Sequence, residues 1–86
     1  MNRENLFFRV RAIQQMFQRQ ILDAEIRYTL STGRVTEIFP AEPAYSIQRI
    51  SGSRPLRNIQ VVMAENRDTQ NKIILTAYES KHDSDS

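Results

Sequence analysis

The sequence predicts an α+β domain in which two N-terminal helices pack on one face of a four-stranded antiparallel sheet. Three patterns in its 86 residues support this fold class. Before Gly33, apolar residues recur every three or four positions, which is the period of an amphipathic helix. From Arg34 onward the period is two, as in strands with one buried face. Short polar segments separate four such runs, which is typical of an antiparallel meander.

The first helix is expected over residues 8–19. One side of this segment carries its apolar residues, namely Phe8, Ala12, Ile13, Met16 and Phe17. Arginines and glutamines occupy most of the remaining surface. Leu6 and Phe7 fit either the start of this helix or a short strand before it.

The second helix is expected over residues 23–32. Ile26 and Leu30 lie four positions apart, and we expect both to face the first helix. The link around Gln20 is short, so the two helices should form an antiparallel pair. Gly33 follows the helix directly and is expected to supply its left-handed end.

Four strands complete the domain. They are expected over residues 34–39, 45–50, 56–64 and 72–79. The last strand is the most apolar, through Ile73, Ile74 and Leu75, which indicates a central place in the sheet. Alternation puts Asn58, Gln60, Val62 and Ala64 on one face of the third strand. It puts Lys72, Ile74, Thr76 and Tyr78 on one face of the last strand.

Length and composition limit the possible function classes. The chain has room for a single domain, which we assign to residues 1–80. Residues 81–86 form a polar tail that contains His82, the sole histidine. Cysteine is absent, which excludes disulfides, thiolate-ligated zinc, iron–sulfur clusters and a thiol nucleophile. We therefore expect a cytoplasmic protein that needs no cofactor or metal.

The charged residues are unevenly distributed. Of the basic residues, ten are arginines and only two are lysines. Residues 1–57 carry a net charge of +4, and residues 58–86 carry a net charge of −2. No segment free of Asp, Glu, Lys and Arg exceeds seven residues, which argues against a membrane span or a signal peptide. The arginines fit either a solvated surface or a basic face that binds RNA or an acidic partner chain.

No nucleotide-binding loop, zinc motif or Ser-His-Asp set occurs in the sequence. Tyr78 is the main candidate from strand alternation, since it lies near the end of the last strand on the same face as Thr76. Its phenol suits contact with a phosphate, stacking on a base or donation of a proton. A tyrosine that buries its ring and leaves its hydroxyl in water fits the same pattern.

Five segments, in order, resemble the motifs of a bacterial family. They are residues 11–21 (RAIQQMFQRQI), 30–35 (LSTGRV), 37–40 (EIFP), 57–66 (RNIQVVMAEN) and 73–79 (IILTAYE). Together they are similar to domain-of-unknown-function family 4258, over about residues 8–80. Members of that family are similar to small RelE-like toxins of toxin–antitoxin pairs. Many of these members look as if they are encoded beside a small zinc-finger antitoxin.

The resemblance implies a RelE-like fold and metal-independent cleavage of RNA. In that reaction the ribose 2′-hydroxyl attacks the adjacent phosphate, so the protein must supply a base, an acid and positive charge. The resemblance assigns Arg57, Gln60 and Tyr78 to catalysis. It assigns Arg11, Arg54 and Thr76 to binding of RNA phosphates and bases. RNA and an antitoxin protein are the expected partners, and an exposed sheet edge also allows a homo-oligomer.

Both histidines of the family pattern are replaced in this chain. The first corresponds to Arg11 and the second to Gln60, or to Arg57 if residues 54–56 are the family's Arg-Pro-Leu. Arginine binds a phosphate but stays protonated, so it cannot act as a general base. The sequence therefore leaves two hypotheses: a toxin-type endoribonuclease, or a catalytically inactive member that binds RNA or a protein.

Overall fold

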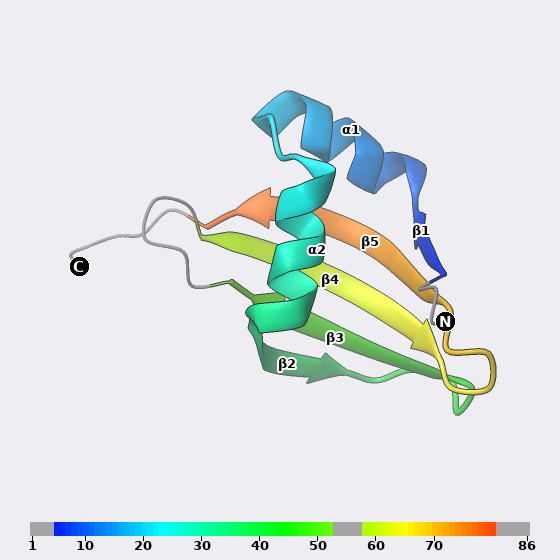
Figure 1. Ribbon diagram of the computed structural model, residues 1–86. Helices are drawn as coiled ribbons and strands as arrows, with labels where there is room; N and C mark the ends of the chain where they lie inside the picture. Colours follow the sequence, from blue (N-terminus) through cyan, green and yellow to red (C-terminus); the bar gives the residue numbers. More distant parts are fainter. Residues whose placement is uncertain (1–4, 53–57, 81–86) are drawn as a thin grey trace.

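A five-stranded sheet with both helices on one face forms the domain (Figure 1). The computed structural model describes residues 5–52 and 58–80. Its elements are β1 (Leu6–Phe8), α1 (Val10–Arg19), α2 (Asp23–Thr32), β2 (Arg34–Phe39), β3 (Tyr45–Ser51), β4 (Ile59–Asn66) and β5 (Lys72–Glu79). The strand order is β1-β5-β4-β3-β2. We call the sheet face opposite the helices the open face, since no described helix lies on it.

The α+β class is confirmed, but the predicted four-stranded antiparallel sheet is wrong. The sheet is mixed, because β1 adds a fifth strand that runs parallel to β5 and pairs Leu6 with Lys72. The other three strand pairs are antiparallel. A strand of three residues is too short to show a period of two, and its partner is at the other end of the chain. β4 is the middle strand, whereas β5 has a neighbour on both sides only over its first residues.

The two helices do not form the predicted antiparallel pair. Figure 1 shows α1 lying along the β5 side of the sheet, while α2 crosses the sheet and packs on β4 and β3. Ile26 is fully buried in the core that α2 forms with the sheet. α1 begins at Val10, after the predicted start, because the preceding residues belong to β1. Each helix packs on the sheet because the sheet offers it a wider apolar surface than the second helix would.

The core lies between the helices and the sheet. Its buried residues are Ala12, Ile21, Ile26, Ile50, Ile59, Val61, Met63, Ile74 and Ala77. The β4 residues among them are the odd-numbered ones, as the predicted alternation requires. Leu6, Phe8, Met16 and Leu30 pack against this cluster and are partly buried.

Gly33 is required for close packing rather than for a left-handed turn. Its φ of −76° is compatible with any residue, so the predicted left-handed helix end is wrong. A Cβ atom at this position would lie 2.6 Å from the carbonyl oxygen of Thr29 and 2.7 Å from that of Ser51. Both neighbours are backbone atoms, so a side chain fits only if α2 and β3 move apart.

We expect Gly33→Ala to lower the free energy of unfolding by about 1–3 kcal/mol, the usual range for overpacking. Urea denaturation measures the change. Gly52→Ala is the matched control, because its nearest contacts would be 3.2 Å from the Thr29 hydroxyl and 3.3 Å from the Ile59 carbonyl oxygen, and it should cost less. Equal stability of Gly33→Ala and the native chain would contradict this explanation.

Candidate functional site

An irregularity in the β4–β5 ladder decides which β5 side chains reach the open face. Val62 lies opposite Thr76, but the next residue, Met63, lies opposite Ile74, so Leu75 is an extra residue. Ile74 and Ala77 are therefore both buried against the helices. Thr76 and Tyr78 share a face, as predicted, but Ile74 is not on it.

Three charged or polar side chains meet on the open face at the centre of the sheet. Arg49 on β3 lies opposite Glu37 on β2, and its Nη2 forms an ion pair with the Glu37 carboxylate. The Nη1 of Arg49 donates a hydrogen bond of 3.4 Å to the hydroxyl of Tyr78 on β5. We call these three residues the Arg49 cluster. Its side chains come from three different strands, so the register of the sheet holds them together.

The guanidinium group keeps capacity for a ligand. Its Nε donates to the Thr36 hydroxyl at 3.4 Å, so contacts to Thr36, Tyr78 and Glu37 occupy three of its N–H groups. Arginine has five such donors, so two have no protein partner among residues 5–52 and 58–80. The side chain of Arg49 is 33% exposed and that of Glu37 is 44% exposed, so both can contact a molecule on the open face.

The electrostatic surroundings keep Arg49 charged. The hydrogen bond to Tyr78 raises the pKa of Arg49 above its ordinary value; desolvation opposes this shift, and the Glu37 carboxylate adds to it. Because arginine is protonated at neutral pH even without such help, the cluster always presents a cation. Any pH dependence of the site must come from other groups.

Gln60 lies beside the Arg49 cluster, opposite both Tyr78 and Ser51 in the sheet. Its amide nitrogen donates to the Ser51 hydroxyl at 2.8 Å and to the Asn58 side chain at 3.4 Å. Only 9% of its surface is exposed. The structure thus brings Gln60 and Tyr78 together, two of the predicted catalytic residues. The buried amide of Gln60 positions its neighbours and has little surface to offer a ligand.

Thr76 uses its hydroxyl to hold α1 on the sheet. It donates a 2.6 Å hydrogen bond to the side-chain oxygen of Gln15, which also accepts the backbone N–H of Ala77 at 3.0 Å. These contacts lie beyond the residues that β1 covers, where β5 would otherwise expose a backbone donor. Gln15 therefore covers part of a sheet edge.

The remaining predicted residues lie elsewhere. Arg11, at the start of α1, lines a hollow of about 490 Å³ together with Arg9, Val10 and Leu75. Arg54, Arg57 and the tail residue His82 lie outside the described residues.

Sequence reasoning missed Arg49 and Glu37. Both were placed in strands, but neither was assigned to the site. The available signal was an arginine in the interior of a strand, between Ile47 and Ile50, where a solvated side chain is unusual. The alternation of β3 gives the face of Arg49, but only the register of the sheet brings it beside Glu37 and Tyr78.

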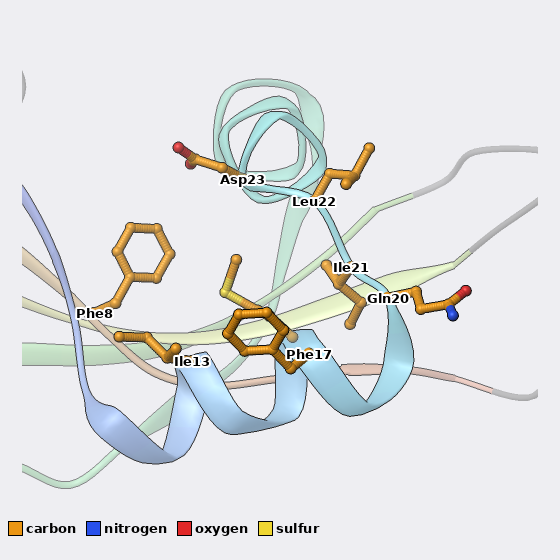
Figure 2. Close-up of a pocket in the computed structure, with 8 residues that line it drawn as sticks. Phe8, Ile13, Phe17, Gln20, Ile21, Leu22 and Asp23 are labelled. Carbon is orange, nitrogen blue, oxygen red and sulfur yellow. The ribbon is translucent and has the colours of Figure 1, made fainter.

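A second hollow lies between α1 and the start of α2. Figure 2 shows Ile13 and Phe17 on α1 and Phe8 from β1 facing the space below Leu22. This groove encloses about 430 Å³, and its polar side chains are Gln20 and Asp23. Its wall is mostly apolar, and the residues that line it include the Asp23 carboxylate but no cation to hold a phosphate.

Two further findings concern the described residues as a whole. Within residues 5–52 and 58–80, no group of His, Asp and Glu side chains is arranged to hold a metal ion. No helix in the same residues is long and apolar enough to cross a membrane.

Comparison with known proteins identifies one family. The family model described as "Domain of unknown function (DUF4258)" matches residues 9–79, which include both helices and all strands except β1. Neither the curated proteins nor the solved structures gave a match to the chain.

We expect Gln15→Ala to lower the free energy of unfolding by about 1–3 kcal/mol, because it leaves the partly buried N–H of Ala77 without its acceptor. Gln15→Glu keeps an acceptor oxygen and should lose less. Thermal or urea unfolding of both variants measures the difference. If the two variants are equally stable, the hydrogen bonds of Gln15 do not hold α1 on β5.

Proposed function

We propose that this chain, which belongs to the family described as Domain of unknown function (DUF4258), binds RNA on the open face of its sheet and cleaves it without a metal ion. One observation carries the proposal: the Arg49 guanidinium contacts the Glu37 carboxylate on one side and the Tyr78 hydroxyl on the other. A cation flanked by a proton acceptor and a proton donor is the set that phosphodiester transfer needs.

The proposed reaction begins with the 2′-hydroxyl of a ribose. Glu37 accepts the proton of that hydroxyl, whose oxygen then attacks the adjacent phosphorus. The bond from phosphorus to the 5′-oxygen of the next nucleotide breaks, and Tyr78 donates its phenol proton to the leaving oxygen. The products are a 2′,3′-cyclic phosphate and a free 5′-hydroxyl. The two remaining N–H groups of Arg49 hold the phosphate oxygens, where negative charge develops.

The ion pair between Arg49 and Glu37 serves this reaction before RNA arrives. It fixes the guanidinium plane between β2 and β5, so the phosphate meets donors that are already oriented.

The motif resemblance to RelE-like toxins also supports a biological role. We propose that the chain acts as the toxin of a bacterial toxin–antitoxin pair and is held by a protein antitoxin. The excess of arginine supports a polyanionic target. Arg54 and Arg57 precede β4 in the sequence and stay predicted phosphate contacts.

A second candidate function is a binding module without catalysis. It is favoured by the absence of histidine from the described residues and by the ion pair, which already engages the cation of the cluster. In that case Arg49 binds an RNA phosphate, or a carboxylate of a partner protein, and Glu37 and Tyr78 transfer no proton.

An RNA-cleavage assay in EDTA, with and without ribosomes, tests the proposal. We expect Glu37→Gln and Tyr78→Phe each to slow cleavage by about 10²–10⁴-fold, the usual contribution of a general base or acid. Arg49→Lys should also slow cleavage, because lysine cannot contact both neighbours and the phosphate in one plane. Asp23→Asn, an exposed carboxylate on α2, is the control and should cleave as the native chain does.

Two outcomes would overturn the catalytic assignment. Full cleavage by Glu37→Gln and Tyr78→Phe would place the reaction elsewhere. If the native chain binds RNA without cutting it, and Arg49→Ala abolishes binding, the binding module is the correct function.

A further inference from the structure

We propose that an unpaired RNA base binds in an apolar hollow on the open face, next to the Arg49 cluster. This inference rests on the proposed function and names the part of the RNA that the site recognises. The hollow encloses about 440 Å³, a volume within the range of small-ligand sites. Ile47, Ala64 and Ile73 form its floor from three neighbouring strands, and Leu75 forms a side wall.

The floor belongs to an apolar row that crosses the sheet. Strand register places five residues side by side, namely Phe7, Ile73, Ala64, Ile47 and Phe39. None of them belongs to the core between the sheet and the helices. Phe7, at one end of the row, is 53% exposed. An apolar row with aromatic ends on a face without helices needs an occupant, and sheet faces with exposed aromatic residues stack unpaired bases.

The spacing matches a nucleotide that is also bound at Arg49. Arg49 and Ile47 are alternate residues of β3 and therefore lie on the same face, about 7 Å apart. A phosphate at the Arg49 guanidinium would thus have an adjacent base over Ile47. Leu75, the extra residue of β5, lines the hollow three residues before Tyr78.

Charge around the hollow favours a nucleic acid over a protein strand. Arg9 lines the hollow, and Arg9 and Arg11 both line the adjoining hollow beside Leu75. α1, which follows Arg9, contains no acidic residue. The two arginines thus offer positions for the flanking phosphates of a single strand.

Tyr45 and Glu42 supply the groups that a base requires. Tyr45 lies at the rim, two residues before Ile47 on the same face of β3, and its ring can stack on a planar base. Glu42, the acidic residue at the rim, can accept hydrogen bonds from the amino or ring N–H groups at a base edge. The chemistry therefore selects a base that presents donors to a carboxylate.

The test uses the full chain and a short single-stranded RNA that cannot be cleaved because its ribose 2′-oxygens are methylated. Its dissociation constant is measured by fluorescence anisotropy. We expect Tyr45→Ala to bind about 5- to 150-fold more weakly, the range for one lost base–aromatic stack. Tyr45→Phe keeps the ring and should bind as the native chain does. Tyr28→Ala, which removes a half-exposed tyrosine from α2, is the matched control.

A second probe assigns the effect to the base. The bases of the RNA are removed one at a time. At one position in the RNA, the loss of the base should weaken binding to the native chain. The same loss should not weaken binding to Tyr45→Ala any further, because that variant lacks the ring on which the base stacks. Arg9→Gln, which leaves the hollow's floor intact, should reduce the dependence of log affinity on log salt by about one. This variant keeps the test valid if Tyr45→Ala does not fold.

The outcomes separate this inference from the proposed function. If the native chain binds RNA and neither Tyr45→Ala nor Arg9→Gln changes the affinity, the hollow takes no base, while RNA binding at the Arg49 cluster stands. If Tyr45→Ala instead changes the oligomeric state in light scattering, with RNA affinity unaltered, the apolar row is a protein interface and the inference is wrong. Failure of the native chain to bind any RNA would overturn both.

Discussion

One extra residue in β5 determines what each face of this sheet can do. With Leu75 inserted in the ladder, Ile74 and Ala77 both turn to the helices, and Tyr78 turns to the open face. Strict alternation from the buried Ile74 would instead direct Thr76 and Tyr78 into the core. The bulge therefore allows one strand to supply apolar residues to the core and polar residues to the site on the open face. Leu75 itself becomes a wall of the hollow beside the site.

The N-terminal segment completes this arrangement from the other side of β5. β1 pairs with only the first residues of β5, and α1 then follows the remaining edge, where Gln15 takes over the hydrogen bonding. The connection between β1 and α1 brings Arg9 against Ile74, through a backbone hydrogen bond of 3.0 Å, and thus beside Leu75. The same connection that lets α1 follow the sheet edge also places Arg9 at the rim of the open face.

Local patterns predicted the elements better than their arrangement. The period change at Gly33, the polar turns and the alternation of β4 gave both helices and four strands. Three residues carry no period, so the sequence offers β1 only as an alternative to an earlier start of α1. The bulge was missed since a period of two assumes a regular ladder. Tyr78 followed from alternation and Gln60 from the motif resemblance, but alternation within one strand does not tell which residue of the next strand lies opposite. Arg49 and Glu37 needed that cross-strand register, so they were found only in the folded chain.

The central claim is that RNA contacts the open face at the Arg49 cluster. The most direct measurement is an NMR titration of isotope-labelled protein with a short single-stranded RNA that carries methylated 2′-oxygens. We expect the largest shifts at the guanidinium of Arg49 and at the backbone amides of Glu37, Gln60 and Tyr78, with smaller shifts around Ile47 and Ile73. Shifts confined to the groove at Phe17 and Leu22, or no shifts at all, would contradict the claim.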